Sequence, residues 1–217
     1  MNMNLFFPIL QANLIVCLAH SYALFLIYKI SPPHKLSTFD SITRFPLIFF
    51  ASLLGTGYLA PYSIYFSAPF STATQWFIAA LFVSFYTDLK TLLISRTVTL
   101  YLIPAVWLAA YNNLLPLSLY ESVIGTISGY CLLWVIAQTA AYYYKQEAIG
   151  QGDIELLAFI GSYVGFYSCW KTLLIGSIVG SLASLIYVAI THQKNVRTVR
   201  LPFGSFLVIG AVISLFF

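Results

Sequence analysis

The sequence has few charged residues: only 7% of its 217 residues are Asp, Glu, Lys or Arg, whereas 60% are hydrophobic. A water-soluble domain carries about 25% charged residues, so this chain has too few to cover an aqueous surface. The mean hydropathy of +0.89 agrees with this deficit. A mainly soluble fold is therefore excluded, and membrane lipid is expected to surround most of the chain.

Clustered positive charge is also absent. The formal net charge is +4 and the pI is about 8.9, but the Lys and Arg residues are spread between apolar segments. Nucleic-acid binding needs a concentrated basic surface, so we expect no nucleic-acid partner. Basic residues between apolar segments more often set the orientation of a membrane protein.

The usual sequence signatures of metal sites and nucleophilic enzymes are missing. The three cysteines are far apart with no CxxC spacing, which argues against a structural zinc site and against a disulfide framework. They are Cys17, Cys131 and Cys169. The three histidines have no ligand spacing, and no HExxH, GxSxG or phosphate-binding loop occurs. We therefore expect no metal and no cofactor.

Eight apolar segments approach the length of about 20 residues that a transmembrane helix needs. They cover residues 5–30, 45–60, 72–87, 98–115, 122–144, 154–168, 172–190 and 201–217. Pro104 is expected to kink the fourth segment. Because the loops between them are short, we predict an all-α polytopic integral membrane helix bundle of about eight transmembrane helices. It forms a single domain over 1–217, with no soluble domain.

The distribution of basic residues predicts the orientation. With eight spans and the N-terminus outside, nine of the ten Lys and Arg residues fall in cytoplasmic loops, and only Lys171 lies outside. This is a strong positive-inside asymmetry. The first ten residues contain no basic residue before the apolar run, so the first span is expected to be retained rather than cleaved as a signal peptide.

Three GxxxG spacings fall within predicted spans, at Gly125–Gly129, Gly161–Gly165 and Gly176–Gly180. Small residues at this spacing allow membrane helices to approach closely. We predict that they pack helices within one bundle, and dimerisation is the less favoured use.

Only six acidic residues occur, and two of them lie at the ends of predicted spans. Asp88 ends the third span and Asp153 opens the sixth, so both reach the cytoplasmic side at similar depth. Acids at membrane spans are costly and mark functional sites. From position alone, Asp88 could equally be a loop residue paired with Lys90 or Arg96. Asp153 could likewise be a helix N-cap.

Two carboxyl groups held together can share one proton, because ionising both is costly. One can then activate a water as general base while the other polarises a peptide carbonyl. This aspartyl-protease chemistry needs neither a metal nor a nucleophilic side chain. Gly150 and Gly152 precede Asp153 and would leave room for an extended substrate backbone.

Four blocks of the sequence, in order, resemble the type IV prepilin peptidases. Residues 150–158, GQGDIELLA, followed by Gly161 and Gly165, resemble the family pattern GxGDxKLxAxxGxxxG. Residues 88–95 resemble the first family motif, in which an Asp is followed six residues later by Ile-Pro. Residues 201–207, LPFGSFL, resemble its PFGPFL signature, and residues 42–47 resemble SxRYPLVE.

The resemblance implies a membrane aspartyl endopeptidase whose catalytic pair is Asp88 and Asp153, with Gly150 and Gly152 supporting the site. The implied substrates are prepilin- or pseudopilin-like membrane proteins of type IV pilus or type II secretion systems. Their leader peptides would be cleaved at the cytoplasmic face. The implied location is the bacterial cytoplasmic (inner) membrane, multi-pass, and the oligomeric state is left open.

Several residues depart from the family pattern. The expected Ile-Pro-Asp ends in Ser95 and Arg96, and the expected Lys after GxGDx is Glu155. We hypothesise that Glu155 helps to attract a basic leader. The family's paired CxxC motifs do not occur, and Phe49 stands where its glutamate is expected, so N-methyltransferase activity is predicted to be weak or absent. Methylated N-termini produced by this protein alone would contradict that.

Two alternatives remain open from the sequence. The chain could be a small ion-coupled transporter that uses Asp88 and Asp153 as cation or proton sites. It could also be a non-catalytic family member. Both acids fall at span ends and no internal repeat is evident, which disfavours the transporter, and neither motif acid is lost, which disfavours the inert protein.

Overall fold

A computed structural model describes residues 71–145, 149–191 and 202–215, and most positions between 18 and 29. These residues form helices and no strands, so the all-α prediction is confirmed for them. The helices are α3 (Ser71–Thr91), the short 3-10 helix η4 (Leu100–Leu102), α4 (Ile103–Tyr111), α5 (Leu119–Tyr144), α6 (Gln151–Thr191) and α7 (Phe203–Ser214). The predicted span 45–60 and most of 5–30 lie outside the described residues.

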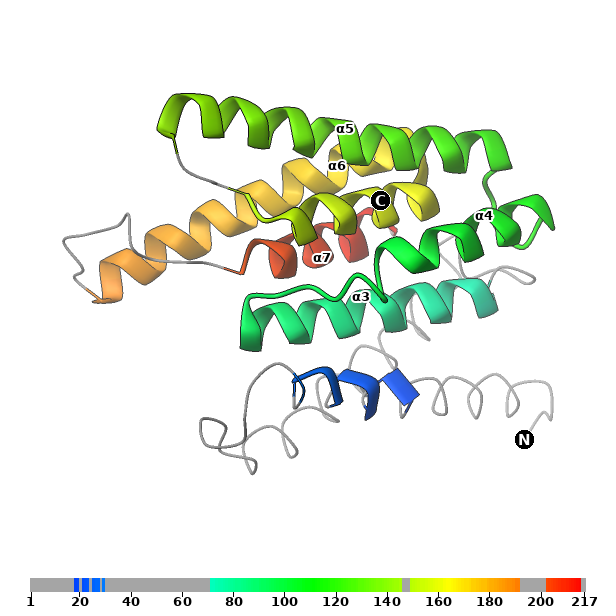
Figure 1. The fold of residues 1–217 in the computed structure, drawn as a ribbon, viewed down its shortest axis with the longest axis horizontal. Coiled ribbons are helices and arrows are strands. Elements are labelled where there is room, and N and C mark those ends of the chain that lie inside the picture. The colour runs from blue at the N-terminus through cyan, green and yellow to red at the C-terminus, as the bar shows by residue number, and fades with distance from the viewer. Residues whose placement is uncertain are drawn as a thin grey trace.

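Helix α6 is two helices joined at Gly165. This glycine has φ 80° and ψ −179°, which breaks the helix. Beyond it the chain reverses, so that the Cys169 thiol lies 4.0 Å from the Leu157 carbonyl oxygen, whereas residues twelve apart on a straight helix are about 18 Å apart. Figure 1 shows this reversal at one end of the bundle. The two halves correspond to the predicted spans 154–168 and 172–190.

The first half of α6 is the centre of the bundle. Every residue from 154 to 165 is buried, which is expected for a helix that is apolar on all sides. Tyr163 stacks on Phe77 of α3, with ring centroids 3.9 Å apart, and its hydroxyl donates to Thr74 at 2.6 Å. Helix α7 lies between α6 and α3 (Figure 1) and packs against both.

Glycines allow the close helix packing predicted from the GxxxG spacings. A Cβ on Gly125 would collide with the backbone of Gly161, and one on Gly176 would lie 3.0 Å from the Phe206 carbonyl oxygen. The first contact joins α5 to α6, and the second joins α6 to α7. The prediction that these glycines pack helices within one bundle is therefore confirmed.

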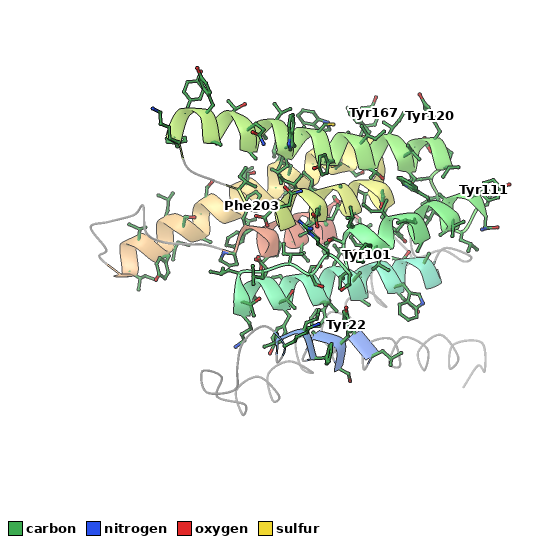
Figure 2. All side chains as sticks on the ribbon, viewed as in Figure 1. Tyr22, Tyr101, Tyr111, Tyr120, Tyr167 and Phe203 are labelled. Atoms are coloured by element: carbon green, nitrogen blue, oxygen red, sulfur yellow. The ribbon has the colours of Figure 1, made fainter. Side chains whose placement is uncertain are left out.

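Two helical stretches are long and apolar enough to cross a membrane, namely Leu119–Tyr144 and the part of Gln151–Ile190 that follows the reversal at Gly165. Large apolar side chains on their outer faces are exposed, among them Trp134, Leu174 and Leu185. An aqueous surface rarely carries so extensive an apolar face. Tyr111, Tyr120 and Tyr167 project at one end of the bundle (Figure 2), where aromatic side chains suit a membrane interface.

Two of the predicted spans contain helices that are shorter than the spans themselves. Helix α4 has 9 residues and α7 has 12, whereas the predicted spans were 98–115 and 201–217. The kink predicted at Pro104 is wrong, because Pro104 lies in the first turn of α4. At that position a proline leaves no intrahelical hydrogen bond unmade.

Candidate active site

The carboxyl groups of Asp88 and Asp153 both lie against Gly204, at the start of α7. A Cβ built on Gly204 would be 3.1 Å from Oδ2 of Asp88 and 3.0 Å from Oδ1 of Asp153. The two oxygens are therefore no farther apart than the sum of these distances. One water donating to both would bridge about 4.5 to 5.5 Å, which lies within this upper limit.

Asp88 lies in the last turn of α3 and is buried, with 4% of its surface exposed. Its Oδ2 accepts a hydrogen bond from the Ser205 backbone N–H at 2.7 Å and another from the Ser205 hydroxyl at 2.9 Å. That hydroxyl also lies 3.2 Å from the Phe85 carbonyl oxygen. The alternative that Asp88 is a loop residue paired with Lys90 or Arg96 is therefore wrong.

Asp153 lies in the first turn of α6 and is partly exposed. The helix begins at Gln151, so Asp153 is its third residue, and the alternative that it is the N-cap is wrong. Backbone hydrogen bonds from Gly150 and Gly204 reach its carboxyl group. A side chain at the third position that reaches back to the backbone before the helix is a known way of fixing a helix start.

The first turn of α7 contacts both acids. Its Ser205 N–H donates to Asp88, and its Gly204 N–H reaches Asp153. The free N–H groups and the dipole at a helix N-terminus favour negative charge. This turn therefore supplies the carboxyl pair with donors without placing a cation in the site.

The two glycines predicted to support the site differ in their surroundings. Among the described residues, a Cβ on Gly150 would meet Oδ2 of Asp153 alone, at 3.4 Å. A Cβ on Gly152 would lie 3.0 Å from the Cβ of Ile94. Ile94 therefore occupies the room predicted for a substrate backbone beside Gly152, and the room beside Gly150 stays a prediction.

Glu155 is paired rather than presented to solvent. Its Oε1 forms an ion pair with Nε of Arg96 at 3.1 Å, and only 4% of the Glu155 side chain is exposed. Direct attraction of a basic leader by this carboxylate, as hypothesised from the sequence, would first require Arg96 to leave. The two departures from the family pattern therefore meet in one ion pair.

Sequence reasoning missed Ser205 and Ile94 as parts of the site. Ser205 stands where the PFGPFL signature has a proline, and a proline could donate neither of the two hydrogen bonds to Asp88. That departure was a visible signal for Ser205. Ile94 carried no such signal, because an isoleucine is expected at that position of the motif.

Among residues 71–145, 149–191 and 202–215, no three His, Cys, Asp or Glu side chains gather as a metal site. The chemistry described above uses only the two carboxyl groups and a water.

Comparison with known proteins identifies a matching family and several named relatives. The model of the type IV leader peptidase family matches residues 76–187, just over half of the chain and including both aspartates. A protein of Burkholderia pseudomallei named prepilin leader peptidase/N-methyltransferase is 34% identical over 179 residues, which is 80% of this chain and 55% of that protein. Proteins of the same name from Haemophilus influenzae and Pectobacterium carotovorum are 35% and 32% identical over 60% and 59% of this chain.

The chain spans about half the length of these curated relatives, 54% of the Haemophilus protein and 45% of the Pectobacterium protein. No solved structure matches the chain.

Proposed function

The chain belongs to the type IV leader peptidase family, and on that premise we propose that it is a membrane aspartyl endopeptidase. Its substrates would be prepilin- or pseudopilin-like membrane proteins, from which it removes the leader peptide. The observation that carries the proposal is that the carboxyl groups of Asp88 and Asp153 both lie against Gly204. These two acids come from helices far apart in the sequence.

In the proposed mechanism, a water lies between the two carboxyl groups. The ionised carboxyl takes a proton from this water while the water oxygen attacks the scissile carbonyl carbon. The protonated carboxyl donates to the carbonyl oxygen, and a proton then passes to the leaving nitrogen. The substrate would enter beside Gly150 and the partly exposed Asp153, because Asp88 is buried behind Ser205.

We also propose that the chain is one domain with eight spans, its N-terminus outside, in the bacterial cytoplasmic membrane. The nine-to-one distribution of Lys and Arg between the two sides supports this orientation. A reporter enzyme that is active only outside the membrane should be active when fused after Tyr111 and inactive when fused after Lys145. The reverse pattern would contradict the orientation.

The proposed function is tested by co-expressing the chain with candidate prepilins in a host that has no prepilin peptidase of its own. We expect the prepilin to be shortened by its leader, as read by gel mobility and by the N-terminal sequence of the product. Absence of a shortened product with all prepilins tested would count against the proposal and favour the transporter alternative.

Ser205→Ala is expected to lower the turnover number kcat about ten-fold or more, since a hydrogen bond to a charged group contributes about 1.5–3 kcal/mol. The variant keeps the backbone N–H but loses the hydroxyl donor to Asp88. Ser214→Ala is the matched control. It removes another buried hydroxyl of α7, one that bonds to Thr172 instead of to an acid. Equal kcat values for the two variants would contradict a role of the Ser205 hydroxyl.

A further inference from the structure

Arg96 and Glu155 form an ion pair next to the carboxyl pair. We propose that it acts as a clasp that holds the segment 92–99 against α6 and so fixes the spacing of Asp88 and Asp153. The inference rests on the proposed function. It makes Arg96 and Glu155 positioning residues, which act through Ile94, rather than residues that touch the substrate.

The clasp is asymmetric in its burial. The Arg96 side chain is 64% exposed, whereas the Glu155 side chain is 4% exposed, and the two meet at 3.1 Å. The second carboxylate oxygen, Oε2, is buried and has no hydrogen-bond partner within the described residues. A buried carboxylate that loses its counter-ion is strongly destabilised. Glu155 therefore holds Arg96, and the backbone of the segment, at the surface of α6.

Ile94 connects the clasp to the acids. It lies two residues before Arg96, with its Cβ against Gly152 and its Cδ1 against Gly204. Gly152 immediately precedes Asp153, and Gly204 lies close to both carboxyl oxygens. Ile94 is thus packed between the start of α6 and the start of α7, and a displacement of its side chain changes the space in which the carboxyl groups face each other.

The segment is also attached at its two ends, where Val98 and Thr99 are buried at the far end. The Thr97 hydroxyl lies within hydrogen-bonding distance of Ser95 at 2.6 Å and of Tyr22 at 2.5 Å, but both contacts are exposed to solvent. At its start, the Leu92 N–H donates to the Asp88 carbonyl oxygen at 2.8 Å. The segment therefore begins on Asp88 itself and ends on buried Val98 and Thr99, and the Arg96 ion pair holds the part between these ends.

The signs of the two charges support a pair rather than two separate functions. In the motif pattern that this chain resembles, the residues at these positions are Asp and Lys, whereas here they are Arg96 and Glu155. Both signs are reversed, and the two reversed residues are in contact. Attraction between them is preserved by this exchange, while the charge offered to a leader peptide is not.

The test is a charge exchange in the full chain, reconstituted in lipid vesicles with a purified prepilin. Arg96→Asp and Glu155→Lys should each lower kcat about ten-fold or more with little change in KM, because a small misplacement of catalytic groups is costly. The double variant should recover to within about three-fold of the wild type. Lys90→Asp, which reverses an exposed charge at the end of α3, is the matched control and should leave kcat unchanged.

A double variant no more active than the single variants, at equal amounts of inserted protein, would overturn the clasp. Wild-type kcat in either single variant would overturn it too, and a loss confined to KM would show leader recognition instead. Where a reversal prevents insertion, Arg96→Gln and Glu155→Gln replace it. The double Gln variant should then lose no more kcat than the worse single variant, and a loss equal to the product of the two single losses would overturn the clasp.

An inactive wild-type protein would count against the proposed function rather than against the ion pair. The four proteins would then be compared by melting temperature in detergent. A melting temperature that recovers in the double variant supports the coupling of the two residues. A melting temperature that does not recover overturns this coupling.

Discussion

Replacing Asp88 or Asp153 with asparagine is expected to stop leader removal while leaving the protein in the membrane. Asparagine has nearly the same size but cannot take up or release the shared proton. General acid–base catalysis contributes about 10²- to 10⁴-fold, and each variant loses a partner on which the other depends. The measurement is the fraction of co-expressed prepilin that becomes mature, normalised to the amount of inserted enzyme.

Glu121→Gln is the matched control for these variants. Glu121 is an exposed acid in the first turn of α5, where it forms a capping box with Ser118. Its neighbour Tyr120 projects at the end of the bundle away from Phe203, which opens α7 (Figure 2). We expect normal processing by Glu121→Gln. Full processing by both Asp88→Asn and Asp153→Asn would remove the basis for an aspartyl mechanism.

The scarcity of charge made the two acids identifiable from the sequence. With so few acidic residues in an apolar chain, an aspartate at a span end is costly enough to require a reason. The charge count also placed Asp88 and Asp153 on the same side of the membrane, and in the structure their carboxyl groups meet at Gly204. Their catalytic roles stay a prediction.

The contacts around the acids could not be predicted, because they join residues far apart in the chain. Ser205 and Asp88 are separated by 117 positions, and no local pattern shows that the first turn of α7 faces the end of α3. Arg96 and Glu155 were each recognised as departures from the family pattern. Only their contact shows that the two departures belong together.

The ends of the helices could not be predicted from the sequence either. The apolar run through α6 contains no charged residue between Glu155 and Lys171, so hydropathy alone could not place the reversal at Gly165. The two helices were predicted, but the turn falls inside the predicted span 154–168. A glycine in the left-handed region is what the reversal requires.

Gly204→Ala is expected to reduce kcat by about 10²-fold, the cost of a misplacement of about 1 Å among reacting groups. The added methyl group would lie 3.0 Å from the Asp153 carboxyl and 3.1 Å from the Asp88 carboxyl, and against the end of Ile94. Ile94 can rotate away, but the carboxyl groups are held by the first turn of α7 and would have to separate. The same methyl group would occupy the space assigned to the shared water.

Gly180→Ala is the control for this substitution. It adds a methyl group in α6 that lies 3.0 Å from the ring of Phe206, a side chain that can shift. Both variants are compared for inserted amount, melting temperature and kcat on the same prepilin. A Gly204→Ala protein with wild-type kcat would show that the carboxyl pair does not work across this glycine. Loss of kcat without loss of melting temperature would locate the effect in the spacing of the acids.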